Sequence, residues 1–274
     1  MTEFLSLMIK PFVACLILVG IHAYLGLHVI ERGVIFVDLA LAQIAALGAT
    51  VGFAFGFGLH SGASYLTALS FTFIGAVIFS LTRFRKPVVP HEAIIGIVYA
   101  ISASAVILVL SRAPEGGEEL KSLLVGHLLF VDWDEIIKMG IIYGVIGFFH
   151  WWCRKPLLLI SQNPHLAFEN GLPVRWWDFF FYTTFGFVVT SSVEMAGVLL
   201  VFAFLVVPSV CAAWIFHTIG KRLAFGWILG VLTSIGGIIG SYVLDFPTGA
   251  MIVCTFGLTL LICAPIGSVL RQKG

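Results

Sequence analysis

Long apolar stretches, each close in length to a membrane-spanning helix, dominate this sequence. A helix needs about 20 consecutive apolar residues to cross the hydrocarbon core of a bilayer. Charges or turn-forming residues separate nine candidate stretches, at residues 4–27, 34–56, 63–82, 92–111, 135–153, 177–193, 196–216, 223–243 and 248–268. We therefore expect an all-α fold, a polytopic transmembrane helical bundle with nine spans. An alternative with eight spans merges or loses one of these helices.

The composition argues against a water-soluble globular protein. Of the 274 residues, 60% are hydrophobic and 11% are charged, whereas soluble domains have about 25% charged residues. The formal net charge of +1 provides no basic field that would attract nucleic acid. We expect a single transmembrane domain over residues 1–274, surrounded by membrane lipid.

Basic residues lie in alternate connections between the candidate spans. Eleven of them fall on one side: Arg32, Arg83, Arg85, Lys86, Arg154, Lys155, Arg175, Lys221, Arg222, Arg271 and Lys273. The connections on the other side are mainly acidic. Because Lys and Arg near helix ends stay in the cytoplasm, we predict a multi-pass protein of the cell membrane, with its N-terminus outside and its C-terminus in the cytoplasm.

Two connecting segments are predicted to form short helices that do not span. Residues 112–134 form an external loop with a short apolar middle, where we expect an interfacial or capping helix. In the cytoplasmic loop 154–177, Asn163 can cap a helix that starts at Pro164, and Gly171 can end it in the left-handed conformation. Because a helix of two turns is marginal alone in water, it packs either on its own membrane domain or on a cytoplasmic partner.

Motifs for catalysis and nucleotide binding are missing from the sequence. The segment HEAII at 91–95 begins like a zinc-protease motif, but Ile95 stands where the second histidine is needed. The phosphate-binding pattern GxxxxGK[ST] does not occur. No two histidines stand four residues apart on one helix, so the sequence predicts no dedicated metal site and any metal ligands stay unknown. We expect no catalytic residues, no ATP-binding motif and no covalently bound cofactor.

Three polar side chains stand out in or beside the apolar stretches: Asp38, Gln43 and Glu194. Such groups are unfavourable in lipid unless they are paired, near the interface or facing a polar cavity. Asp38 can be explained by the positive end of its helix or by an ion pair with Arg32. An interhelical hydrogen bond would explain Gln43. Glu194 is expected at the outer end of a helix, as a gate or as a solvated terminus.

Six segments follow one another in a recognisable order. They are GVIFVDLALAQIAALG at 33–48, HEAIIGIVYA at 91–100, LKSLLVGHLLFV at 120–131, NPHLAFENGLPV at 163–174, AGVLLVFAFLVVPSVCA at 196–212 and DFPTGAMIV at 245–253. Together they resemble the permease subunits of metal-importing ATP-binding cassette (ABC) transporters, the ABC-3 family, over nearly the whole chain. The resemblance implies a subunit that moves divalent zinc, manganese or iron ions into the cytoplasm.

The same resemblance implies partners and a role for the short helix. It implies a homodimer of permeases, two cytoplasmic subunits that bind and hydrolyse ATP, and an extracytoplasmic metal-binding protein that delivers the ion. It also identifies the short helix as the coupling helix, which seats in a groove of the ATPase. The residues of this helix are Asn163, Pro164, His165, Leu166, Ala167, Phe168, Glu169, Asn170 and Gly171.

One segment departs from the family pattern. In the second helix of the family an Asp and a His lie four residues apart, with the His five residues before a glycine. Counting back from Gly48, Gln43 stands at the His position. Leu39 stands at the Asp position, and Asp38 lies one residue earlier. Because Gln is a poor ligand for zinc, although its oxygen suits a harder ion, the identity of the carried ion stays open.

We predict that Asp38, Gln43 and Glu194 line the translocation route. At a rise of about 1.5 Å per residue, Gln43 lies roughly 15 Å from the cytoplasmic end of its helix, near the middle of the bilayer. Asp38 and Gln43 diverge by ~140° around one helix, so they form one site only where two chains face each other. A rival interpretation is a stand-alone secondary transporter driven by an ion gradient. That class uses repeat-related broken helices, which the sequence does not show.

Overall fold

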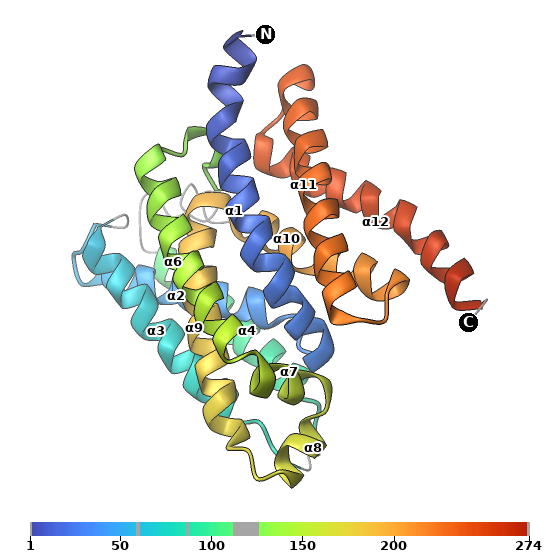
Figure 1. Ribbon diagram of the computed structural model, residues 1–274. Coiled ribbons are helices and arrows are strands. Elements are labelled where there is room, and N and C mark those ends of the chain that lie inside the picture. Colours follow the sequence, from blue (N-terminus) through green and yellow to red (C-terminus); the bar gives the residue numbers. More distant parts are fainter. Residues whose placement is uncertain (1, 59–60, 86–87, 112–125, 273–274) are drawn as a thin grey trace. The chain divides into compact units, whose positions relative to one another are not determined.

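The computed structural model describes residues 2–58, 61–85, 88–111 and 126–272. Over these ranges it contains eleven α-helices, one 3-10 helix and no β-strand, so the predicted all-α class is confirmed (Figure 1). The elements are α1 (Thr2–Arg32), α2 (Val37–Ala54), α3 (Gly62–Leu81), α4 (His91–Leu110), η1 (Leu128–Phe130), α6 (Trp133–Trp152), α7 (Arg154–Gln162), α8 (Pro164–Glu169), α9 (Val174–Ala196), α10 (Val198–Ile215), α11 (Ile219–Leu244) and α12 (Thr248–Gln272).

Among the described residues, seven helices are long and apolar enough to cross a membrane: Leu7–Arg32, Val37–Ala54, Gly62–Leu81, His91–Leu110, Val198–Ile215, Ile219–Leu244 and Thr248–Val269. The pair α6 and α7, bent by 77° at a short break, raises the number to eight if it forms one span. The predicted count of nine is therefore not confirmed. Helix α9 is the predicted span that is not among these seven helices or the bent pair. Its 23 residues would extend about 34 Å. Charged residues, Arg175 and Asp178, and several Trp and Thr residues make α9 less apolar than the others.

The chain packs into two compact units. The first comprises Met1–Ile30, Leu124–Val145 and Glu194–Gly274, and in it α10, α11 and α12 pack against one another. Helices α11 and α12 approach each other closely at Gly237, where a Cβ atom would lie 2.6 Å from the Cα atom of Ile252. Any larger residue would separate the helices, so this contact depends on a small residue, as is common in membranes.

The second unit comprises Glu31–Leu123 and Ile146–Val193. In it α2 packs on both α3 and α4. At Gly48 the backbones of α2 and α3 come together, because a Cβ atom there would lie 2.7 Å from the carbonyl oxygen of Thr67. Helix α2, which carries two of the predicted route residues, is thus held by two neighbours in its own unit.

The predicted helix of the external loop lies mainly at residues 112–125, which are outside the described residues. The described remainder of the loop contains the short helix η1. Just before η1, the backbone N–H of His127 donates a hydrogen bond to the carbonyl of Met195 at 2.9 Å. The end of this loop is therefore tied to the last turn of α9.

The short helix predicted from Asn163 onward is confirmed as α8. The side-chain oxygen of Asn163 accepts a hydrogen bond from the backbone N–H of Leu166 at 3.1 Å, and Pro164 is the first helical residue. Asn provides the cap because its oxygen satisfies a backbone N–H that has no partner within the helix. Proline fits the first position since it has no N–H to satisfy.

The C-terminal end of α8 also agrees with the sequence. Gly171 has a φ angle of +71°, a conformation that glycine adopts without a steric penalty. The N–H of Leu172 donates to the carbonyl of Ala167 at 3.0 Å, and that of Gly171 donates to Phe168 at 3.1 Å. This pair of hydrogen bonds is a Schellman motif. Local chemistry therefore defines both ends of α8.

Candidate functional site

Asp38, the first of the predicted route residues, is buried in the first turn of α2. Its exposed fraction is 1%, and neither carboxylate oxygen has a hydrogen-bond partner among the described residues. The ion pair with Arg32 that would have explained it is not formed, because Arg32 bonds to Asp178 instead. The first-turn position does place the carboxylate near the positive end of the helix. A buried carboxylate without a hydrogen bond is nevertheless unfavourable, so Asp38 calls for another explanation.

Gln43 lies on a different face of α2 from Asp38. Gln43 and Leu39 are one helical turn apart and both are partly exposed, whereas Asp38 is buried. Residues four apart share one side of a helix, so Leu39 and Gln43 form part of an open stripe. The structure thus keeps Asp38 and Gln43 apart within one chain, as their spacing indicates.

Glu194 is exposed in the last turn of α9. It belongs to the first unit, whereas Asp38 and Gln43 belong to the second. The exposure of Glu194 is compatible with both roles considered for it, a gate and a solvated helix end.

Helix α8 has one buried face and one open face. Ala167 is fully buried in a cluster with Ile160 of α7 and Val174 of α9. On the other side Leu166 is 41% exposed, and Glu169 is exposed as well. The helix therefore packs on its own unit, as one alternative predicted, and still presents a surface that a partner can contact.

A buried group of polar and charged residues lies close to α8. It consists of Arg32, Arg83, Ser161 and Asp178, and we refer to it as the Arg32 cluster. The Nη1 atom of Arg32 donates to Oδ1 of Asp178, and its Nε donates to Oγ of Ser161 at 2.9 Å. The Nε atom of Arg83 lies 3.6 Å from Oδ2 of Asp178. The side chains of Arg32 and Asp178 have no exposed surface, so this ion pair is shielded from water.

The Arg32 cluster joins the ends of several helices in the second unit. Arg32 is the last residue of α1, and Arg83 follows the end of α3. Ser161 lies in the last turn of α7, and Asp178 lies in the second turn of α9. The guanidinium of Arg32 also lies 4.1 Å from the centre of the Phe181 ring, a cation–π contact. Movement of any one of these helix ends must therefore disturb the others.

A second set of contacts joins the starts of α2 and α4. The backbone N–H of Phe36, the residue before α2, donates to Oε1 of Glu92 at 2.9 Å. His91, the first residue of α4, has its Nε2 atom 3.4 Å from the hydroxyl of Tyr182 in α9. These contacts fix the beginning of α2, where Asp38 lies, relative to α4 and α9.

Sequence reasoning missed Asp178. It grouped Arg32 and Arg83 with the basic side of the protein, considered Asp38 as the partner of Arg32 and assigned no partner to Arg83. A signal was present, because Asp178 stands inside the candidate span 177–193, where an unpaired carboxylate is unfavourable. The partner itself was not visible from the sequence, since Arg32 and Asp178 are 146 positions apart.

Histidine, cysteine and carboxylate side chains are the usual protein ligands of transition metals. Within the part of the chain that the structure describes, no three His, Cys, Asp or Glu side chains gather in a way that could hold a metal ion. A route that an ion must leave again requires weaker contacts than a structural site does. The predicted route residues Asp38, Gln43 and Glu194 accordingly belong to no such group among the described residues.

Comparisons with known proteins give one consistent result. A family model described as the ABC 3 transport family matches residues 4–266. The chain is 26% identical over 258 residues to the "Probable iron transport system membrane protein" of Haemophilus influenzae, which covers 93% of this chain and 88% of that protein. It is 24% identical over 244 residues to the "Manganese transport system membrane protein MntC" of Listeria monocytogenes. That match covers 85% of this chain and 81% of the Listeria protein.

A solved structure has the same fold. It is described as "PsaBC from Streptococcus pneumoniae in complex with Fab" and matches with a TM-score of 0.80 and 20% sequence identity. The match covers 100% of this chain and 99% of that chain. At this level of identity the comparison establishes the shared fold.

Proposed function

Since this chain belongs to the ABC 3 transport family, we propose that it is the membrane-spanning permease subunit of an ABC importer that moves divalent manganese, iron or zinc ions into the cytoplasm. The observation that carries the proposal is the family match over residues 4–266, together with relatives named for iron and manganese transport. The seven helices able to cross a membrane, counted over the described residues, support it. Zinc is included on the sequence resemblance alone.

In this proposal the chain is one subunit of a larger transporter complex. Two copies form the passage, two cytoplasmic subunits hydrolyse ATP, and an extracytoplasmic protein delivers the ion. Residues 1–274 act as one permease domain of the cell membrane, with the N-terminus outside and the C-terminus in the cytoplasm. Helix α9 and the α6–α7 pair add two spans to the seven, which gives nine. The alternation of basic and acidic connections along the sequence supports this orientation.

The segment from Asn163 to Gly171 contacts the ATPase through the open face of α8. Support comes from the exposed Leu166 side chain and from the capped ends that make so short a helix well defined. Burial of Ala167 against Ile160 and Val174 links any displacement of α8 to α7 and α9. Helix α8 is therefore anchored to its own unit by its buried face, and the ATPase displaces it by contact with the open face.

The Arg32 cluster passes this displacement to the spans. Asp178 lies one turn after Val174, the residue at which α8 packs on α9. Because Asp178 is bonded to Arg32 and close to Arg83, a shift of α9 pulls on the ends of α1 and α3. Buried ion pairs hold a fixed geometry, since breaking one leaves an uncompensated charge.

Asp38, Gln43 and Glu194 are the proposed contacts of the ion along the route. Asp38 has two buried carboxylate oxygens without a hydrogen-bond partner among the described residues, which leaves them available to a cation. Gln43 offers an amide oxygen on an open face of α2. Such oxygen ligands suit Mn²⁺ better than Zn²⁺, so manganese is the ion that we expect to be carried best.

The test is uptake by vesicles that contain the permease together with its ATPase subunits. We expect ATP-dependent accumulation of Mn²⁺ against a gradient, and ATP turnover that divalent ions stimulate. Vesicles with the permease alone are the control and should accumulate nothing. Uphill uptake by the permease alone would instead establish a secondary transporter and would contradict the proposal.

A further inference from the structure

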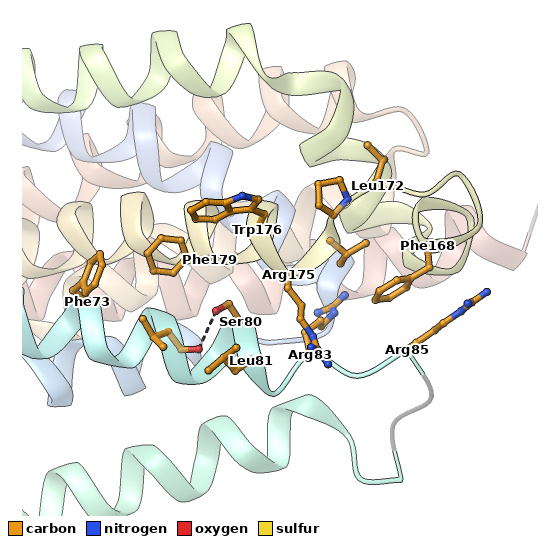
Figure 2. A pocket seen from close by; sticks show the side chains of 13 residues that line it. Phe73, Ser80, Leu81, Arg83, Arg85, Phe168, Leu172, Arg175, Trp176 and Phe179 are labelled. Atoms are coloured by element: carbon orange, nitrogen blue, oxygen red, sulfur yellow. Dashed lines mark hydrogen bonds between the residues drawn. The ribbon is translucent and has the colours of Figure 1, made fainter.

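A cavity of about 810 Å³ lies between α3 and α9 in the second unit. One end of it is apolar and aromatic, lined by Phe73 and Val77 of α3 and by Trp176 and Phe179 of α9. Figure 2 shows the three aromatic side chains ranged along the two helices. The Phe73 and Phe179 rings meet edge to face at 5.2 Å. This end of the cavity is therefore apolar on both helices.

The other end of the same cavity is basic. Arg83, Arg85 and Arg175 line it. Figure 2 shows Arg83, after the end of α3, near Arg175 of α9, and Arg85 farther along on the other side of Phe168 of α8. No carboxylate of the described residues lines the cavity. The cavity therefore changes along its length from apolar to positively charged.

A second cavity of about 260 Å³ continues the basic end. It shares Arg83, Arg85 and Phe168 with the first cavity. Arg32 and the two histidines His91 and His165 also line it, and within the part of the chain that the structure describes no carboxylate does. Asp178 contacts both Arg32 and Arg83. One carboxylate between two guanidiniums leaves an excess positive charge, to which Arg85 and Arg175 add.

We infer that the two cavities together bind one anionic phospholipid, with its phosphate at Arg83, Arg85 and Arg175 and an acyl chain along Phe73, Val77 and Phe179. Guanidinium groups bind phosphate through paired hydrogen bonds. Basic pockets at the cytoplasmic ends of membrane helices are suited to acidic lipid headgroups, and Trp176 lies where an interfacial tryptophan is expected. Among membrane components, an anionic phospholipid matches both the charge and the apolar groove.

The position of this site places a bound lipid in contact with α8. Phe168 of α8 lines both cavities, so the lipid contacts the helix proposed to meet the ATPase. A bound phospholipid therefore braces α8 against α3 and α9. The inference requires that the chain lie in a membrane, but not that it carry a metal ion.

The test uses the purified full chain in detergent and phosphatidylglycerol as the probe, with phosphatidylcholine as the neutral comparison. Native mass spectrometry counts bound lipid, and a phosphatidylglycerol with a photoreactive acyl chain marks the residues that it contacts. We expect selective retention of phosphatidylglycerol and labelling within residues 73–81 and 176–179. Labelling of other helices instead would overturn the site.

Matched variants separate this site from general surface charge. Arg85→Gln with Arg175→Gln should weaken phosphatidylglycerol binding by about tenfold or more, as expected for two interfacial charges. Arg85→Lys with Arg175→Lys should retain much of the binding. Lys155→Gln is the control, because Lys155 is an exposed basic residue outside both cavities. An equal loss with Lys155→Gln would refute a specific site.

A third variant tests the acyl groove without changing charge. Val77→Trp fills the apolar end of the cavity and should lower retention of phosphatidylglycerol and labelling by the photoreactive lipid. If Val77→Trp fails to fold, the site is still tested by photoreactive labelling of the unmodified chain, which needs no variant. Two further outcomes would identify another ligand. Release of the lipid by millimolar inorganic phosphate would show that the site binds free anions. Crosslinks from residue 85 or 175 to the ATPase, in place of lipid, would show that this surface is a protein interface. Either result would overturn the inference.

Discussion

The guanidinium of Arg32, at the end of α1, is hydrogen-bonded to the carboxylate of Asp178 in α9, and neither side chain is exposed. Arg83 lies on the other oxygen of the same carboxylate. One acidic residue thus holds two arginines from separate helix ends. Because Arg32 and Arg83 line a cavity with Phe168 of α8, we expect this contact to influence how α8 is attached to the spans.

Replacing Asp178 should weaken the fold. Asp178→Asn keeps the shape of the side chain but leaves Arg32 buried without its counter-charge, and we expect the free energy of unfolding to fall by about 3–5 kcal/mol. Denaturation of the purified chain in mixed micelles measures this. Asp245→Asn is the control, since Asp245 is exposed at the end of α11 and Asn tolerates its left-handed conformation. Equal stability of Asp178→Asn and the parent chain would rule out a structural role for the ion pair.

Replacing Asp38 should have the opposite effect on stability. Its carboxylate has no hydrogen-bond partner among the described residues, so Asp38→Leu removes a buried polar group and should raise the free energy of unfolding by about 1–3 kcal/mol. Transport should fall sharply, because an ion contact is lost. The same denaturation assay and the vesicle uptake assay measure the two effects. A large loss of stability in Asp38→Leu would show that Asp38 is a structural residue.

Replacing Gln43 should change the preferred ion. Imidazole is a better ligand for zinc than an amide oxygen, so Gln43→His should raise the ratio of zinc to manganese uptake by about tenfold, the effect of ~1.4 kcal/mol of binding. Gln43→Leu should lower the uptake of both ions. Competition between the two ions in reconstituted vesicles measures the ratio. Normal uptake by a well-folded Gln43→Leu protein would remove Gln43 from the route.

A charge on the open face of α8 should detach the ATPase. Leu166→Glu adds a negative charge at a 41% exposed position and should lower co-purification of the ATPase by about tenfold or more, whereas the stability of the permease should change by less than ~0.5 kcal/mol. Gln162→Glu adds the same charge at an exposed position of α7 and should leave co-purification intact. If both variants retain the ATPase, the partner contacts another surface.

Residues on either side of the α9 span should react with reagents on opposite sides of the membrane. In a cysteine-free background, Glu169→Cys, at the end of α8, should be labelled only from the cytoplasm. Glu194→Cys, in the last turn of α9, should be labelled only from outside, because most of the length of α9, about 34 Å, lies between the two positions. A membrane-impermeant thiol reagent applied to intact cells and to inverted vesicles distinguishes the two sides. Labelling of both cysteines from one side would show that α9 does not span.

Much of the fold follows from local patterns in the sequence. The predicted boundaries of α2 to α4 lie within a few residues of the observed ones, because the apolar stretches end where charges and turn residues begin. Both ends of α8 were predicted from Asn163, Pro164 and Gly171, since capping depends on residues only three to five positions apart. The span count was less certain, because α9 mixes charged and aromatic residues.

The amino-acid sequence by itself determined which segments are apolar enough to cross a membrane, how α8 begins and ends, and the family to which the chain belongs. Only the tertiary structure decided that Asp178 neutralises Arg32, that Asp38 is left without a hydrogen-bond partner among the described residues, and that arginines from α9 and the end of α3 line one cavity. The physical reason is distance along the chain. Helix formation and capping depend on neighbours within a few residues, whereas a charge selects its partner only after segments 146 positions apart have packed together.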